Sequence, residues 1–185
     1  MVLMAPANES EARNMLYTAY KHEGPSAVRY PRGSGSGVPE ESEMTALPIG
    51  RAEIVRDGEG IAILAFGVML NPSLIVGSEL DATVVNMRFV RPLDKQSILH
   101  IAETHLLLVT IEDNVVSGGA GSGVNELLQE YGYNIPILNL GLPDQHIEQG
   151  SREQMLAACS LDPAGIKSAI QKRIPVELAA TKSTA

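Results

Sequence analysis

The sequence is poor in several residue types that often mark a functional class. It contains no tryptophan and only 4% aromatic residues, which leaves no platform on which nucleic-acid bases could stack. Its single cysteine, Cys159, excludes an internal disulfide framework and a cysteine-built metal site, and it fits a reducing cytosol. The net charge is −8, with 14 basic against 22 acidic residues, and this argues against nucleic acid or an anionic membrane as a partner.

Long apolar runs are also missing. No run reaches the roughly 18 residues that a membrane-spanning helix needs. The first residues show neither the basic region nor the small-residue cleavage site that is typical of a signal peptide. We therefore expect a cytoplasmic protein without membrane contact. Its 185 residues, with 44% hydrophobic content, suffice for one domain plus a piece of another.

Strand and helix patterns alternate along most of the chain. Short apolar runs bounded by turn residues predict strands, and N-capping residues followed by apolar positions at helical spacing predict helices. Strands are expected at 2–5, 26–30, 51–56, 61–66, 83–87, 106–111 and 135–140, and helices after Asn8, Pro72, Asp94, Gly118, Ser151 and Asp162. The turn 57–60 is expected to join two of these strands as a hairpin. The alternation predicts an α/β fold with a mostly parallel sheet covered by helices.

A segment rich in glycine, serine, proline and glutamate interrupts this alternation. It covers residues 34–48, and its Ser-Gly-Ser-Gly stretch cannot hold regular structure, so it is interpreted as an interdomain linker. The chain then divides into residues 1–33, this linker, a domain at 49–174 and a flexible tail at 175–185.

Two arginines follow the strand predicted at 26–30. Residues 24–33 read Gly-Pro-Ser-Ala-Val-Arg-Tyr-Pro-Arg-Gly, so Arg29 and Arg32 flank Tyr30 and a proline that forces an extended bend. The planar fork of an arginine side chain matches a phosphate or a carboxylate. The segment therefore predicts either an anion-binding strand end or a surface ion pair.

Three other constellations favour structural roles. The glycine-rich turn at 118–123 opens a helix, but it is neither a P-loop nor a dinucleotide fingerprint, and Glu112 and Asp113 before it would repel phosphate, so close packing is favoured. The histidines do not show the spacing that is typical of metal ligands, and His146 is interpreted as an exposed loop residue. Arg88 and Arg91 flank a turn, where ion pairing or capping explains them.

Seven blocks, in their order and spacing, carry a resemblance to a known family. They resemble the C-terminal part of the 1-deoxy-D-xylulose 5-phosphate synthases, which are transketolase-like enzymes. The blocks cover residues 1–6, 15–17, 24–33, 47–50, 86–94, 118–126 and 138–144. The resemblance implies a transketolase C-terminal-like domain preceded by the end of a pyrimidine-binding domain. It also implies a decarboxylating condensation of pyruvate with glyceraldehyde 3-phosphate that depends on thiamine diphosphate and Mg²⁺ and feeds isoprenoid, thiamine and pyridoxal synthesis.

The same resemblance limits what this chain does alone. Family members are over three times longer, and the Gly-Asp-Gly motif that holds the diphosphate is absent, so no catalytic, cofactor-binding or metal-binding residue is expected here. Arg32 is the implied substrate-phosphate arginine, with Arg29 as a weaker candidate and Tyr30 as a neighbouring wall. The chain is expected to be inactive alone, to need the N-terminal part of the synthase, and to form a homodimer through its packing domain.

Two alternatives stay open at this point. The chain could be the C-terminal part of another transketolase-family enzyme, either transketolase or the beta subunit of a pyruvate dehydrogenase. It could also be a non-catalytic α/β oligomerisation module that folds and acts by itself.

Overall fold

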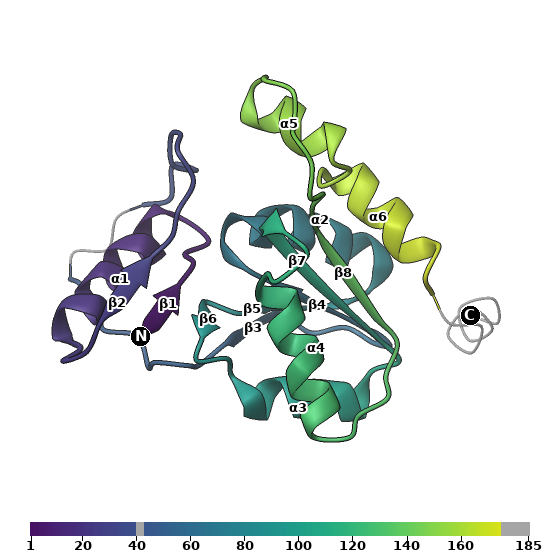
Figure 1. Ribbon diagram of the computed structural model, residues 1–185, viewed down its shortest axis with the longest axis horizontal. Helices are drawn as coiled ribbons and strands as arrows, with labels where there is room; N and C mark the ends of the chain where they lie inside the picture. Colours follow the sequence, from purple (N-terminus) through teal and green to yellow (C-terminus); the bar gives the residue numbers. More distant parts are fainter. Residues whose placement is uncertain (40–42, 175–185) are drawn as a thin grey trace.

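Two sheets organise the chain, a three-stranded one formed largely by its first residues and a five-stranded one in its larger part (Figure 1). The computed structural model describes residues 1–39 and 43–174. The predicted flexible tail and residues 40–42 of the predicted linker lie outside the described residues. The elements are β1 (Val2–Met4), α1 (Glu9–Lys21), β2 (Ser26–Val28), β3 (Glu53–Arg56), β4 (Ile61–Ala65), η1 (Gly67–Met69), α2 (Leu70–Leu80), β5 (Thr83–Asn86), β6 (Phe89–Arg91), α3 (Lys95–Thr104), β7 (Leu107–Val115), α4 (Ala120–Glu130), β8 (Ile137–Leu142), α5 (Arg152–Ala158) and α6 (Pro163–Gln171).

The five-stranded sheet confirms the α/β prediction. Its order is β3-β5-β4-β7-β8, and every pair is parallel except β3 with β5. Each residue of β4 is buried, as expected for a strand that is covered on both faces. Helices α2 and α6 contribute to the apolar core on one face, and α3 and α4 contribute to the core on the other. None of the helices in the described ranges is long and apolar enough to cross a membrane.

The predicted hairpin at residues 51–66 is wrong. Strands β3 and β4 do lie in one sheet, but β5 is inserted between them and pairs with both. The turn at Gly58 packs instead against the end of α2, where an added Cβ atom would lie 2.5 Å from the carbonyl oxygen of Asp81 and 2.7 Å from the nitrogen of Thr83. This close approach to a backbone explains the glycine, which the sequence pattern had suggested as part of a tight hairpin.

The three-stranded sheet joins the N-terminal residues to the larger part of the chain. Strand β1 pairs in parallel with β2 and antiparallel with β6, which is a strand that the sequence patterns did not predict. Beneath this sheet, the side chains of Met4, Met15 and Phe89 are fully buried against one another. On the same helix, the neighbouring Leu16 is 54% exposed and does not belong to this core. The boundaries of the domain division stay a prediction, because the two parts share one sheet and one small core.

Arg88 forms ion pairs that link the N-terminal residues to the larger part of the chain. Its Nε donates to Glu11 at 2.8 Å, and its terminal nitrogen pairs with Glu53. The amide of Asn86 donates to the same oxygen of Glu11 at 2.8 Å. The prediction that ion pairing explains Arg88 is therefore confirmed, with partners from α1 and β3.

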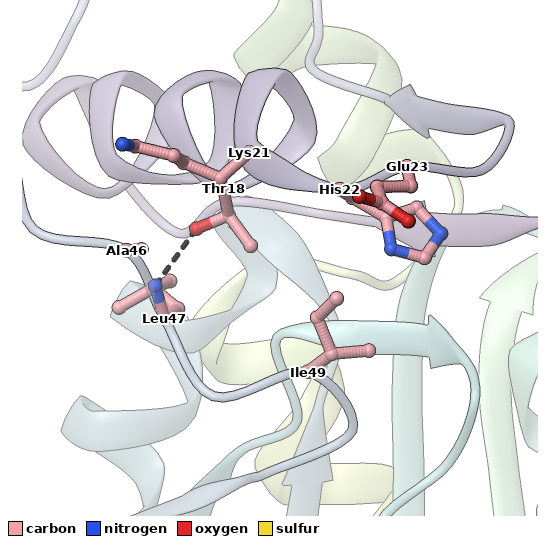
Figure 2. Close-up of a pocket in the computed structure, with 7 residues that line it drawn as sticks. All are labelled: Thr18, Lys21, His22, Glu23, Ala46, Leu47 and Ile49. Carbon is pink, nitrogen blue, oxygen red and sulfur yellow. Dashed lines mark hydrogen bonds between the residues drawn. The ribbon is translucent and has the colours of Figure 1, made fainter.

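The described part of the predicted linker is bound to α1. The backbone nitrogen of Thr45 donates to Asn14 Oδ1 at 2.9 Å, and that of Leu47 donates to Thr18 Oγ1 at 2.8 Å. Figure 2 shows the second bond, which ties the segment to the last turn of α1. As predicted, this segment has no helix or strand, but side chains of α1 satisfy part of its backbone.

His105 predicts a pH-dependent contribution to stability. Its ring lies at the end of α3 with Nδ1 3.1 Å from the carbonyl oxygen of Ile101 and Nε2 2.9 Å from Thr83 Oγ1, and burial lowers its pKa below the usual 6.5. Because the pKa of His105 is lower in the native chain, the unfolded chain binds a proton at this residue more readily than the native chain does. The contribution of His105 to the free energy of unfolding is therefore present above about pH 6.5 and is lost as the pH falls below it. Between about pH 7.5 and 5.5, the free energy of unfolding measured by urea denaturation should fall less in His105→Gln than in the unmodified chain.

The control is His146→Gln, because His146 is exposed. This variant should keep the pH dependence of the unmodified chain. An unchanged pH dependence in His105→Gln would contradict the assignment.

Candidate functional site

A groove of about 620 Å³ lies beside the first turns of α1 and contains the predicted arginine Arg32. Residues 30–36 form one wall of the groove, and the start of α2 contributes to another. Arg13 and Arg152 also line it, so three arginines, of which Arg152 also pairs with Asp113, border one hollow in a chain of net charge −8. Such a concentration of arginine suits an anionic ligand.

Arg32 is held at the groove by the local backbone. The β2 ladder continues to Arg29, whose backbone nitrogen donates to the carbonyl oxygen of Met4 at 2.8 Å, and Pro31 then directs the chain into the groove wall. Within the described residues, Arg32 forms no hydrogen bond or ion pair, and its side chain is exposed. Its guanidinium is therefore available to a ligand. Tyr30, which is 62% exposed, lines the same groove.

Arg29 is not available in the same way. One of its terminal nitrogens pairs with Asp113 Oδ1, and the other donates to the backbone oxygen of Asp113 at 2.8 Å. Arg152 approaches Asp113 Oδ2 at 3.3 Å, so this largely buried carboxylate joins two arginines from distant segments. The surface ion pair that the sequence analysis kept as an alternative describes Arg29, whereas Arg32 keeps the capacity to bind an anion.

A carboxylate from α1 binds the loop that follows Arg32. Glu9 Oε2 accepts from the backbone nitrogen and the hydroxyl of Ser36, both at 3.0 Å, and Glu9 Oε1 accepts from the backbone nitrogens of Gly37 at 2.5 Å and Val38 at 2.9 Å. The pKa of Glu9 is lowered to about 2, first by the hydrogen bond from its own backbone amide and then by those from Ser36 and Val38. Sequence reasoning missed this contact because its partners lie nearly thirty residues apart.

The glycine-rich turn at 118–123 is a packing turn, which confirms the sequence interpretation. The backbone nitrogens at the start of α4 donate to Glu112, from Ala120 at 2.8 Å and from Gly121 at 2.9 Å. A Cβ atom at Gly121 would collide with the side chain of Thr110 on β7. The carboxylate of Glu112 thus occupies the position that a phosphate would need at this helix start.

A second hollow, of about 520 Å³, lies between the end of α1 and the segment that precedes β3. Figure 2 shows that Lys21 extends along the helix away from the imidazole of His22, while Thr18 is bonded to Leu47. These side chains do not converge on a common point. Among the described residues, no group of three or more His, Cys, Asp or Glu side chains could hold a metal ion.

Comparisons with known proteins place these features in a family context. A family model described as the C-terminal domain of transketolase matches residues 50–166. The 1-deoxy-D-xylulose-5-phosphate synthases of Nitrosococcus oceani and Nitrosospira multiformis are 53% and 55% identical over 100% and 95% of this chain. The chain spans 29% and 28% of the length of these two relatives.

Two solved structures are similar in fold. A split-gene transketolase, described as an inactive β4 tetramer, superposes with a TM-score of 0.83 at 29% identity and covers 94% of this chain and 58% of its own. A transketolase variant from Pichia stipitis superposes with a TM-score of 0.59 at 14% identity over 94% of this chain and 25% of its own. At that identity the second likeness supports the fold alone.

Proposed function

The chain belongs to the transketolase C-terminal domain family and, within it, to the 1-deoxy-D-xylulose-5-phosphate synthases, and we propose that it is the C-terminal portion of such a synthase. The complete enzyme would condense pyruvate with glyceraldehyde 3-phosphate with loss of carbon dioxide. This portion would supply a phosphate-binding arginine and a domain that packs on the rest of a cytoplasmic homodimer. The identity of 53–55% to synthases favours this enzyme over transketolase or a pyruvate dehydrogenase beta subunit.

The availability of Arg32 carries the assignment of the phosphate site. A phosphate dianion needs donors in a fixed geometry, and the guanidinium of Arg32 presents a fork of donors at the wall of the groove. Arg29, the weaker candidate, would serve the site indirectly, because its pairing with Asp113 fixes the strand end that precedes Arg32. Tyr30 would bound the ligand on one side.

The residues of this chain do not fit the cofactor that the family uses. A Mg²⁺ ion that bridges a diphosphate is held by one or two carboxylates together with the phosphate oxygens, and the Gly-Asp-Gly motif that would supply such a carboxylate is absent from the sequence. The glycine-rich start of α4, where backbone nitrogens could otherwise bind a phosphate, is occupied by Glu112. We therefore assign no residue of this chain to the cofactor, and the N-terminal part of the synthase would supply that site.

The proposal predicts complementation. With thiamine diphosphate, Mg²⁺, pyruvate and glyceraldehyde 3-phosphate, the chain alone should form no 1-deoxy-D-xylulose 5-phosphate, and addition of the N-terminal part of a synthase should restore its formation. The similarity to a split-gene transketolase described as an inactive β4 tetramer supports this expectation. Turnover by the chain alone would contradict it. A stable assembly that never gains activity with the N-terminal part would favour an oligomerisation module.

A further inference from the structure

The loop at residues 33–38 depends on one carboxylate for its shape. It contains three glycines, and Gly37 has a φ of +80°, a backbone conformation that residues with a Cβ atom rarely adopt. A Cβ atom at Gly35 would lie 2.6 Å from the carboxyl carbon of Glu9, so a larger residue there would displace this carboxylate. Such a sequence would be flexible without an external anchor.

Glu9 provides that anchor. Its two oxygens accept four hydrogen bonds from residues 36–38, and three of the donors are backbone nitrogens. Asn8 caps α1 through the backbone nitrogen of Glu11, so the carboxylate is carried on the ordered first turn of a 13-residue helix. The loop is thereby fixed to α1 by hydrogen bonds that involve a charged acceptor, which are stronger than neutral ones.

The bound carboxylate and Arg32 share the same groove. Glu9 and Ser34 line it together with Arg32, which lies directly before the loop. The four donors from the loop stabilise the ionised form of this carboxylate, and each of its oxygens accepts two of these hydrogen bonds. This interaction therefore fixes the chain next to Arg32 and leaves Glu9 engaged with the loop rather than with a ligand.

We propose that Glu9 is a positioning residue, which binds the loop at residues 33–38 and thereby holds Arg32 in place for the phosphate of the substrate. This inference rests on the proposed function, because it takes the ligand of Arg32 to be a phosphorylated sugar. Glu9 itself does not contact the ligand. Its effect on binding passes through the loop and Arg32.

The test compares Glu9→Gln, Arg32→Ala and the double variant in the complete synthase. Glutamine keeps the size but puts an amide donor opposite the backbone donors, so hydrogen exchange in the peptide 33–38 should accelerate. The KM for glyceraldehyde 3-phosphate should rise roughly 10-fold, while the KM for pyruvate stays unchanged. In the Arg32→Ala background, Glu9→Gln should change either constant by less than about 2-fold.

Two further variants act as a supporting test and a control. Ser36→Ala removes one of the four donors and should shift exchange and KM in the same direction by a smaller factor. Glu130→Gln alters an exposed carboxylate on α4 and should change neither quantity.

The outcomes separate this inference from the proposed function. Unchanged exchange in Glu9→Gln, or an equal rise in KM with and without Arg32, would overturn the positioning role while the function stands. If Arg32→Ala alone leaves the KM for glyceraldehyde 3-phosphate unchanged, the proposed function fails, and the positioning role fails with it.

Discussion

Replacement of Arg32 by alanine in the complete synthase is expected to raise the KM for glyceraldehyde 3-phosphate by roughly 10- to 100-fold. A charge-assisted, bidentate hydrogen bond contributes on the order of 1.5–3 kcal/mol, and each 1.4 kcal/mol corresponds to about a factor of ten in binding. Pyruvate carries no phosphate, so its KM should stay within about 2-fold. Steady-state kinetics with each substrate varied in turn measures both constants.

Two other arginines serve as controls for this experiment. Arg173→Ala removes an exposed arginine at the end of the described residues and should change neither constant. Arg29→Ala should instead lower stability, because it leaves the largely buried Asp113 with only its longer contact to Arg152. Equal losses for both substrates in Arg32→Ala would contradict the phosphate assignment.

Phe89→Ala is expected to lower the free energy of unfolding of the chain by about 3–5 kcal/mol, the usual cost of removing a buried phenylalanine ring. Phe89 lies on β6, is fully buried, and packs against Met4 of β1 and Met15 of α1. The loss would therefore weaken the contact between the N-terminal residues and the larger part of the chain. Urea denaturation followed by circular dichroism measures the change.

The matched control is an aromatic residue on the outside of the same unit. Tyr20 on α1 is 84% exposed, so Tyr20→Ala should change the free energy of unfolding by no more than about 0.5 kcal/mol. A loss below about 1 kcal/mol in Phe89→Ala would contradict the small shared core. A second, separate unfolding transition in the unmodified chain would contradict it as well.

The parts of the fold that local sequence determines were predictable. Asn8, Asp94, Ser151 and Asp162 all accept a hydrogen bond from a backbone nitrogen of the first helical turn, as their positions before helical patterns indicated. Ser151 also forms a capping box with Gln154. The buried parallel strands are continuous apolar runs, which is the pattern that sheets covered on both faces require.

Elements that depend on distant partners were not predictable in this way. Strand β6 has three residues, and its partner β1 lies more than 80 residues earlier in the chain. The order of β3, β4 and β5 is likewise set by packing, since a hairpin and an inserted parallel strand require similar apolar runs. Sequence patterns identified β3, β4 and β5 as strands but did not determine which of them pair with each other.

In the candidate site as well, local features were predictable from the sequence and contacts between distant residues were not. The segment that contains Tyr30 and Arg32 is recognisable because arginine, proline and glycine follow directly after a strand. The partner of Arg29 lies on β7, and that of Glu9 lies in the glycine- and serine-rich segment, so neither contact leaves a local signal. The structure adds the contacts that separate the two arginines, because Arg29 is paired with Asp113 and Arg32 is exposed.

The central claim is that Arg32 recognises the phosphate group, and substrate truncation tests it most directly. We would measure kcat/KM of the complete synthase and its Arg32→Ala variant with D-glyceraldehyde 3-phosphate and with unphosphorylated D-glyceraldehyde. The account predicts a loss of roughly 10- to 100-fold for the phosphorylated substrate and less than about 2-fold for the other. Equal losses for both substrates would contradict it and would assign Arg32 a role unrelated to phosphate.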